Sequence, residues 1–183
     1  MLKKIIYYTI ILIFFSFYAY AANLKFTKIV SLDYPWGLTF INDNELLITE
    51  KNGKIKLINL TTKKIKEIEH NLNYSSYGQG GLLDIIYKGN TIWISYSEDR
   101  ASSKTSTSIA KAIYNSTKMN FKNIFQAHPP IKSGYHFGSR LAIQDNYLYA
   151  SVGERGKGMI AQDGSKHPGS IIRIHRDGSI PKD

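Results

Sequence analysis

Residues 134–156 read GYHFGSRLAIQDNYLYASVGERG, and the fold can be inferred by working outward from this stretch. It begins with a glycine-bounded loop that carries His136, followed by a short apolar run. Residues 144–146 are a turn signal, because Asp and Asn side chains bond nearby backbone groups and tolerate left-handed dihedral angles. Residues 147–152 favour a β-strand and are followed by a glycine. The stretch therefore predicts a loop above a tight antiparallel hairpin.

The same hairpin pattern occurs at Asn44–Thr49, Asn90–Ser95 and Asn146–Ser151. Each copy begins with a turn Asn, has aliphatic residues at its third and fifth positions, and ends on Thr or Ser. Successive copies are roughly 50 residues apart, which is the spacing of the four-stranded repeats of a β-propeller. One blade cannot bury both of its faces, whereas stacked blades can. The repeat therefore predicts an all-β fold, a β-propeller.

The chain has room for about three such units, whereas propellers close with about four to eight blades. We expect about three blades of an incomplete ring, because three blades leave two open edges. The chain would then be part of a longer protein, or would need a partner to complete the ring. A β-sandwich also contains hairpins that resemble one another and is the alternative architecture. The constant position of the turn Asn favours the propeller.

Three further segments give expectations about secondary structure. Leu38–Ile68 reads as four short antiparallel strands, with Asn52-Gly53 as a strong hairpin signal. Asn23–Ser31 alternates apolar and polar residues, which suits an edge or closing strand. Glu98–Ser108 is polar and rich in Ser and Thr, and we expect it to be a surface loop.

Residues 1–21 have the pattern of a cleavable signal peptide. Two lysines precede the apolar run Ile5–Phe17, and Ala19-Tyr20-Ala21 has the small-x-small pattern of a cleavage site. The apolar run is shorter than the roughly 20 residues of a spanning helix, although an uncleaved anchor is the alternative. We expect residues 22–183 to be a periplasmic or secreted domain with no stable membrane span. The chain contains no cysteine, so its stability cannot depend on disulfides.

The formal charge of the 183-residue chain is +10. Its lysines are scattered, as at Lys51, Lys54, Lys56 and Lys63, mostly beside turns and on alternating strand positions. No platform of interleaved aromatic and basic residues is visible, and an exported protein rarely meets nucleic acid. The charge therefore indicates a solvated face, and we expect no nucleic-acid partner.

The candidate chemistry lies in two loops. The five histidines lack metal-ligand spacing, so no metal site is predicted. Ser139 is near His136 but lacks the Gly-x-Ser-x-Gly context of a hydrolase nucleophile. The glycine-rich loop around Gln79 precedes the second hairpin, as the His136 loop precedes the third. If the two units are neighbouring blades, both loops face one cavity. There the imidazole can take a proton from a hydroxyl group while the amide orients a bound group.

Five motifs carry a family resemblance when they are taken together and in order. They are Pro35–Leu38 (PWGL), Gly78–Asp84 (GQGGLLD), His136–Leu141 (HFGSRL), Gly153–Gly156 (GERG) and residues 171–183, which run from IIRI to DGSIPKD. This set resembles the soluble, pyrroloquinoline-quinone-dependent sugar dehydrogenases, the glucose/sorbosone dehydrogenase family, and within it the periplasmic aldose sugar dehydrogenases. The resemblance covers nearly all of the mature chain but only the N-terminal half of a typical member.

The resemblance implies a six-bladed propeller with pyrroloquinoline quinone (PQQ) over the central axis. It implies that His136 is the catalytic base and that Gln79 contacts the cofactor. Arg140 and Arg155 are expected to be structural, holding strand ends and loops. Calcium is expected for the family, but the ligands for calcium and most of the cofactor contacts lie in the half that this sequence does not include.

The resemblance also implies the function. The expected activity is oxidation of the anomeric hydroxyl of aldose sugars with hydride transfer to PQQ, in a truncated or split form. The expected partners are an aldose, an external electron acceptor and a complementing C-terminal half. One alternative is a non-catalytic exported propeller fragment, either a binding module or a decayed gene product. Another is an exported β-rich module with no small-molecule site.

Overall fold

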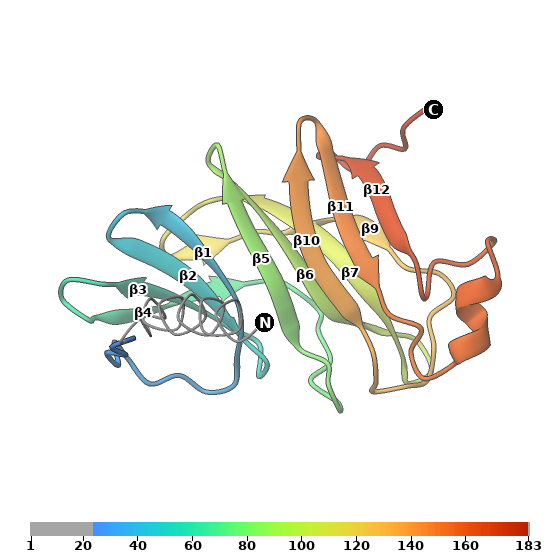
Figure 1. The fold of residues 1–183 in the computed structure, drawn as a ribbon, viewed down its shortest axis with the longest axis horizontal. Helices are drawn as coiled ribbons and strands as arrows, with labels where there is room; N and C mark the ends of the chain where they lie inside the picture. The colour runs from blue at the N-terminus through green and yellow to red at the C-terminus, as the bar shows by residue number, and fades with distance from the viewer. Residues whose placement is uncertain (1–23, 183) are drawn as a thin grey trace, which may run out of the picture.

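The computed structural model describes residues 24–182, which form three β-sheets and one short 3-10 helix, η2 (Gly158–Gln162). Figure 1 shows their order along the chain. Blade one contains β1 (Pro35–Asn42), β2 (Glu45–Glu50), β3 (Lys54–Asn59), β4 (Ile65–His70) and the two-residue β8 (Lys118–Met119). Blade two contains β5 (Leu82–Lys88), β6 (Thr91–Arg100), β7 (Lys104–Ile113) and β9 (Lys122–Gln126). Blade three contains β10 (Gly138–Gln144), β11 (Tyr147–Val152) and β12 (Ile171–His175).

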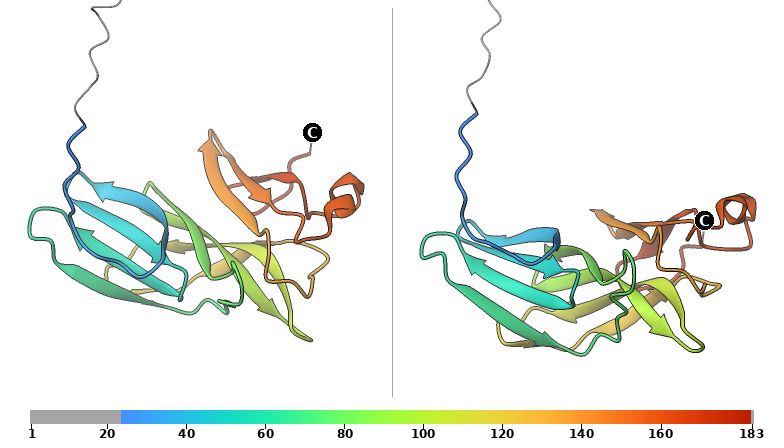
Figure 2. Two further views of the ribbon diagram at one scale, coloured as in Figure 1. Left: turned by 60° about the horizontal axis from the view of Figure 1, so that its bottom comes forward. Right: turned by 90° about the horizontal axis from the view of Figure 1, so that it is seen from below.

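The three sheets follow one another in chain order, as Figures 1 and 2 show. The first strand of the middle blade, β5, contacts the first strands of both neighbours, β1 and β10. Within each blade the strands then run outward in sequence order. This is the arrangement of successive propeller blades, so the predicted propeller is confirmed and the sandwich alternative was wrong. The sheets formed by residues 24–182 do not close into a ring.

The turns follow from the residues that the sequence places in them. The backbone is left-handed at Gly53 (φ 91°), Asn90 (φ 65°) and Asp145 (φ 52°). These residue types adopt positive φ more readily than others, which is what a two-residue hairpin turn requires. The predicted hairpins therefore form in the predicted places, and Leu38–Ile68 does contain four antiparallel strands, β1 to β4.

The hydrophobic core lies between successive blades. Alternate residues of the central strand β6 point to opposite sides. Ile92 and Ile94 belong to the cluster shared with blade one, and Trp93 belongs to the cluster shared with blade three. Because both faces of this sheet are covered, β6 is buried almost continuously rather than on one face only.

Each hairpin repeat ends on a hydroxyl, and the first two of these hydroxyls join successive blades. The hydroxyl oxygen accepts a backbone N–H from the bulged first strand of its own blade at 3.0 Å in every copy: Gly37 to Thr49, Asp84 to Ser95 and Arg140 to Ser151. The Ser95 hydroxyl also donates to the carbonyl of Ser139 in the next blade at 2.7 Å. The Thr49 hydroxyl likewise donates to the Leu83 carbonyl. The repeat therefore needs Thr or Ser at this position because the hydroxyl can accept and donate at once.

The expectation of a surface loop at Glu98–Ser108 was wrong. Strands β6 and β7 pair through this stretch from Arg100 and Lys104 onward. The polar side chains at the ends of the strands are buried in a network around Glu98, whose carboxylate accepts hydrogen bonds from Ser108 at 2.6 Å and from Gln126 at 2.7 Å. Buried polar groups are tolerated when they are hydrogen-bonded, so composition alone was misleading here.

The strand expected at Asn23–Ser31 is also absent from the described residues, which begin at Leu24. Val30 and Leu32 pack against the side chains of blade one, so the segment is held through side-chain contacts rather than by backbone pairing. The predicted signal peptide, residues 1–21, lies outside the described residues. Within residues 24–182, no helix is long and apolar enough to span a bilayer.

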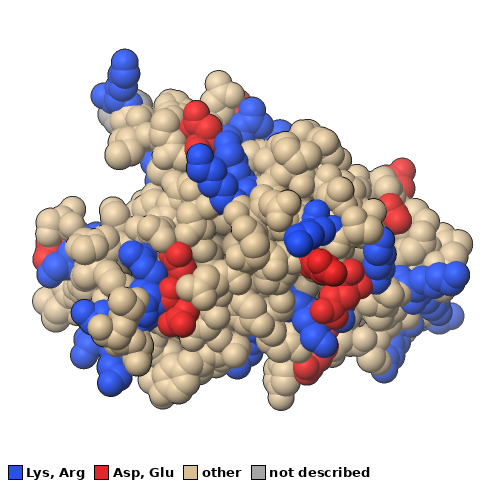
Figure 3. All heavy atoms as spheres, turned by 180° about the vertical axis from the view of Figure 1, so that it is seen from behind, with Lys and Arg blue, Asp and Glu red and all other residues tan. Residues whose placement is uncertain are grey.

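Charged side chains are interspersed on the face seen in Figure 3, where basic groups occur in several separate places and some lie beside acidic ones. The positive charge on this face is divided into several groups. Independently of this view, two lysines of blade one, Lys54 and Lys56, lie 3.8 Å and 2.6 Å from the Glu67 carboxylate, so part of the basic charge is paired with an acidic group.

Candidate functional site

The two loops singled out from the sequence are joined by a pair of hydrogen bonds. The backbone N–H of Gln79 donates to the carbonyl of Gly134 at 2.7 Å. The side-chain oxygen of Gln79 accepts the backbone N–H of His136 at 2.8 Å. The structure therefore brings Gln79 and His136 together, and one amide side chain fixes the loop that carries the imidazole. The side-chain amide nitrogen of Gln79, Nε2, has no hydrogen-bond partner among the described residues.

Both side chains border a hollow of about 250 Å³, which is formed at the first strands and preceding loops of all three blades. Its lining residues are Trp36, Gln79, Leu83, His136, Phe137 and Gly138. The His136 side chain is 54% exposed, so the imidazole is open to a ligand. The sequence did not point to Trp36 as a site residue, because its place in the hollow depends on how blade one packs beside blade two.

The imidazole of His136 is oriented by a carboxylate. His136 Nδ1 lies 2.5 Å from Glu154 Oε1, and the same oxygen accepts the backbone N–H of Gly156 at 3.2 Å. The hydrogen bond from His136 is the main reason that the pKa of Glu154 is lowered from its ordinary value of 4.5. An ionised carboxylate only accepts, so Nδ1 carries the proton, and the tautomer that this selects has its lone pair on Nε2. The arrangement is that of a general base held in one tautomer.

Glu154 was not singled out from the sequence. The available signal was the motif Gly153–Gly156, whose charged pair follows the end of β11. Gly153 lets the segment after β11 approach the His136 loop closely, because a Cβ at this position would lie 1.8 Å from the carbonyl oxygen of His136. His136 itself has φ 48°, in the left-handed region that ordinary residues seldom occupy. Close packing and an uncommon backbone conformation thus coincide at the backbone of His136.

Arg155 anchors the His136 loop from behind. Its guanidinium donates to the carbonyls of Tyr135 at 2.8 Å and Ser133 at 2.5 Å, and to both oxygens of Thr105. It also lies 3.7 Å from the centre of the Phe137 ring. Burial lowers the pKa of Arg155 to about 10. These contacts account for Arg155 as a structural residue of the loop.

Arg140 joins blade two to blade three. Its guanidinium lies 2.9 Å from the carboxylate of Asp84, which is almost fully buried, and 5.4 Å from the centre of the Trp36 ring. Asp84 also accepts the backbone N–H of Leu141 at 2.8 Å. Because two-thirds of the Arg140 side chain is exposed, its charge also reaches the solvent beside the hollow.

Hydrolase chemistry has no support at this site. Ser139 is buried, and among residues 24–182 its hydroxyl oxygen has no hydrogen-bond partner, so no base in this part of the chain activates it. Within residues 24–182, no three His, Asp or Glu side chains cluster in a way that could hold a metal ion. The side chains at the hollow provide a proton acceptor in His136, an amide donor in Gln79 and an aromatic ring in Trp36.

Comparisons of the chain with known proteins agree on one family. The sequence profile of the glucose/sorbosone dehydrogenase family matches residues 32–183. Aldose sugar dehydrogenase YliI of Escherichia coli K12 is 32% identical over 162 residues, covering 83% of this chain and 44% of that protein. A protein of Synechocystis named slr1608 is 28% identical over 177 residues, and 43% of it is covered. The chain thus spans less than half the length of the curated relatives it matches.

Two solved structures have the same fold over the shared part. The soluble aldose sugar dehydrogenase of Escherichia coli in its apo form superposes with a TM-score of 0.79, at 32% identity, over 83% of this chain and 47% of that one. The PQQ-bound aldose sugar dehydrogenase of Streptomyces coelicolor superposes with a TM-score of 0.71, at 25% identity, over 81% of this chain and 46% of that one.

Proposed function

This chain belongs to the glucose/sorbosone dehydrogenase family, and from that membership we propose that it contributes the base-bearing half of a sugar dehydrogenase. The proposed reaction oxidises the anomeric hydroxyl of an aldose to a lactone. The observation that carries the proposal is the imidazole of His136, held by Glu154 in an open hollow with Nε2 available. The names of the relatives supply the substrate class.

Oxidation of an anomeric carbon requires the loss of one proton from the hydroxyl and one hydride from the carbon. In our proposal His136 Nε2 takes the proton, and the Glu154 carboxylate stabilises the imidazolium that forms. The Gln79 side chain keeps the His136 backbone in place while this happens. Holding the base in one position contributes to the rate because the geometry is fixed before the sugar binds.

The residues present fit the quinone cofactor in its general chemistry. PQQ carries carbonyl and carboxylate oxygens, and the hollow offers the unpartnered Nε2 donor of Gln79 and, at its edge, the exposed guanidinium of Arg140. Trp36 adds a partly exposed aromatic ring. When bound, the quinone supplies the two-electron acceptor for the hydride. We propose Gln79 as a cofactor-contacting residue on these grounds.

Several further parts of the proposal rest on the family resemblance. Export to the periplasm or beyond, an external electron acceptor, calcium and a complementing C-terminal half belong to this group. Calcium would require ligands from outside residues 24–182, because these residues contain no acidic or histidine cluster of the necessary kind.

The test is dye reduction by purified protein supplied with PQQ, calcium and an aldose. The chain is assayed alone and together with the C-terminal half of the Escherichia coli relative. We expect reduction that requires His136 and is lost in His136→Asn, while His128→Asn, a histidine outside the hollow, leaves the rate unchanged. No dye reduction by the reconstituted pair, or equal rates with and without the His136 imidazole, would overturn the proposal.

A further inference from the structure

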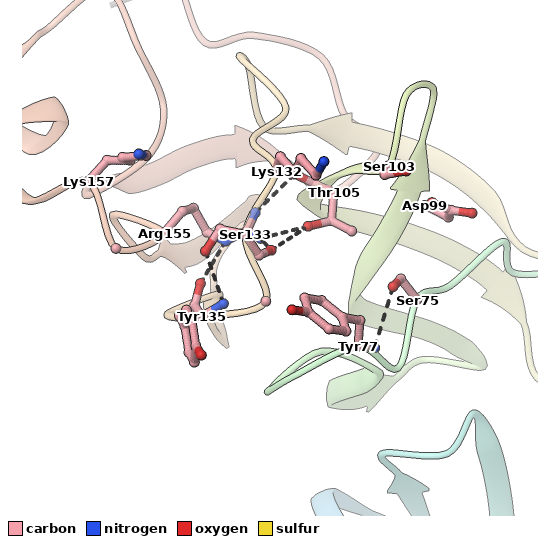
Figure 4. Close-up of a pocket in the computed structure, with 12 residues that line it drawn as sticks. Ser75, Tyr77, Asp99, Ser103, Thr105, Lys132, Ser133, Tyr135, Arg155 and Lys157 are labelled. Atoms are coloured by element: carbon pink, nitrogen blue, oxygen red, sulfur yellow. Dashed lines mark hydrogen bonds between the residues drawn. The ribbon is translucent and has the colours of Figure 1, made fainter.

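A hollow of about 590 Å³ lies between blades two and three, at the end of the blades that carries the hairpin turns. It is separate from the hollow beside the site loops, in which the Tyr77 ring rests on the backbone of Gly134 (Figure 4). The Gln79 loop precedes β5, whereas Lys88, which lines the hollow between the blades, is the last residue of β5. Because β5 is seven residues long, its two ends lie about 20 Å apart. A small ligand in this hollow therefore does not reach His136.

The lining of this hollow carries an excess of positive charge. Its charged residues are Lys88, Lys111, Lys122, Arg176 and Asp177. None of the four basic side chains forms an ion pair within residues 24–182. The Asp177 carboxylate accepts the backbone N–H and the hydroxyl of Ser179 at 2.9 Å and 2.7 Å. This hydroxyl is the main reason that the pKa of Asp177 is lowered from its ordinary value of 3.8. The single acidic group is thus engaged by its own turn and leaves the basic groups uncompensated.

The strand register gathers the three lysines on one face of blade two. Lys111 of β7 and Lys122 of β9 are paired directly opposite each other, and Lys111 is also paired with Trp93 of β6. Residues paired in this way project from the same face, which at Trp93 is the face toward blade three. Lys88 is paired with Thr91, two residues before Trp93, and so shares that face. Like charges directly opposite each other on neighbouring strands are destabilising, and an anion between them removes the repulsion.

The fourth basic group comes from blade three on a turn that is held against blade two. The indole N–H of Trp93 donates to the Arg176 carbonyl at 2.9 Å, and the backbone N–H of Arg176 donates to the Asn146 carbonyl at 3.0 Å. A Cβ on Gly178 would lie 2.7 Å from the Cβ of Ile124, so the turn packs closely on β9. The guanidinium of Arg176 makes one contact of 3.5 Å, with the side chain of Asn146. Most of its donors are therefore available to a ligand.

We propose that this hollow binds a phosphate-bearing anion, either free in solution, such as pyrophosphate, or as the headgroup of an anionic phospholipid. A phosphate group carries a charge of about −1.5 to −2 and three acceptor oxygens, so it matches several cations that converge from two blades better than a carboxylate does. Lys111 and Lys122 bind it as point charges, and Arg176 can donate to two of its oxygens. The volume lies within the range of small-molecule pockets, about 300–1,000 Å³. Because the ligand contacts both blades, its binding stabilises their packing.

The test is calorimetric titration of the purified chain with pyrophosphate, with sodium chloride at matched ionic strength as the control for general screening. We expect saturable binding, which Lys111→Gln/Lys122→Gln weakens at least about tenfold because two facing charges are removed. Lys63→Gln/Lys64→Gln removes two exposed lysines of blade one and should bind within about twofold of wild type. Arg176→Gln should weaken binding at least about threefold, and it tests the site from blade three if the double lysine variant does not fold.

Vesicles separate the two sources of the phosphate group. Cosedimentation with vesicles of phosphatidylglycerol but not of phosphatidylcholine, lost in Lys111→Gln/Lys122→Gln, supports the site and identifies a lipid headgroup. Binding of pyrophosphate without cosedimentation supports the site and identifies a free anion. The proposal is overturned if the wild-type chain binds neither pyrophosphate nor the anionic vesicles, or if the double lysine variant binds them as wild type does. None of these results bears on whether aldoses are oxidised with His136 as the base.

Discussion

Replacement of Asp84 by Ala should strongly destabilise the contact between blades two and three. The Asp84 carboxylate is 3% exposed and accepts the backbone N–H groups of Leu141 at 2.8 Å and Ile85 at 3.0 Å. Leaving each buried N–H group unpaired costs about 1–3 kcal/mol. The ion pair with Arg140 adds no more than about 1 kcal/mol, because the arginine is largely exposed. The expected loss of unfolding free energy is therefore about 3–5 kcal/mol.

Urea unfolding followed by tryptophan fluorescence measures this loss directly. Trp93 is buried in the cluster between blades two and three, and the Trp36 ring lies 5.4 Å from the Arg140 guanidinium, so both tryptophans report on this region. Asp84→Asn keeps one acceptor oxygen and should lose about half as much. Asp43→Ala, at an exposed turn, is the control and should change stability by less than about 0.5 kcal/mol. A loss below about 1 kcal/mol in Asp84→Ala would refute the reasoning, because the carboxylate would then not be the link between the blades.

Two further predictions concern the imidazole. The pKa of Glu154 is lowered in the folded chain, so its pair with His136 stabilises the fold above pH 4.5 and loses this contribution as the pH falls through the lowered value. Glu154→Gln should therefore flatten the fall of urea stability as the pH drops below the ordinary carboxyl value of 4.5, and an unchanged slope would contradict the pairing. Gly153→Ala would force a Cβ to within 1.8 Å of the His136 carbonyl oxygen, and we expect a loss of about 1–3 kcal/mol together with shifted imidazole NMR signals. The outer glycine Gly164, which has open space around it, serves as the control for the second substitution, and equal effects at the two glycines would count against the close approach.

The fold was accessible from the sequence because the signals are local. A turn Asn, alternating apolar residues and a terminal hydroxyl recur in three hairpins. Each of these features sets the local backbone structure through residues that are close to it along the chain. The polar stretch Glu98–Ser108 shows the limit of such reasoning. Its Ser and Thr residues are buried because Glu98 and Gln126 are brought to them by pairing between strands, which composition does not encode.

In the candidate site, too, some features were predictable from the sequence and others were not. The sequence placed Gln79 and His136 on corresponding loops of neighbouring repeats and predicted that both face one cavity. Their direct hydrogen bond came only from the structure. Glu154 could not be assigned to the imidazole in advance, since its carboxylate reaches His136 only across the end of the β10–β11 hairpin.

By itself, the sequence determined that this chain folds into propeller blades and that each repeated hairpin segment ends in Thr or Ser. It also determined which two loops precede the first strands of blades two and three. Only the tertiary structure decided which separate groups meet: the Glu154 carboxylate and His136 Nδ1, the Asp84 carboxylate and the Leu141 N–H of blade three, and the Tyr77 ring and the backbone of Gly134. The physical reason is the separation along the chain over which each kind of interaction acts. Turn and strand preferences are set by neighbours along the chain, whereas a hydrogen bond depends on the positions of two separate segments to within a few tenths of an ångström.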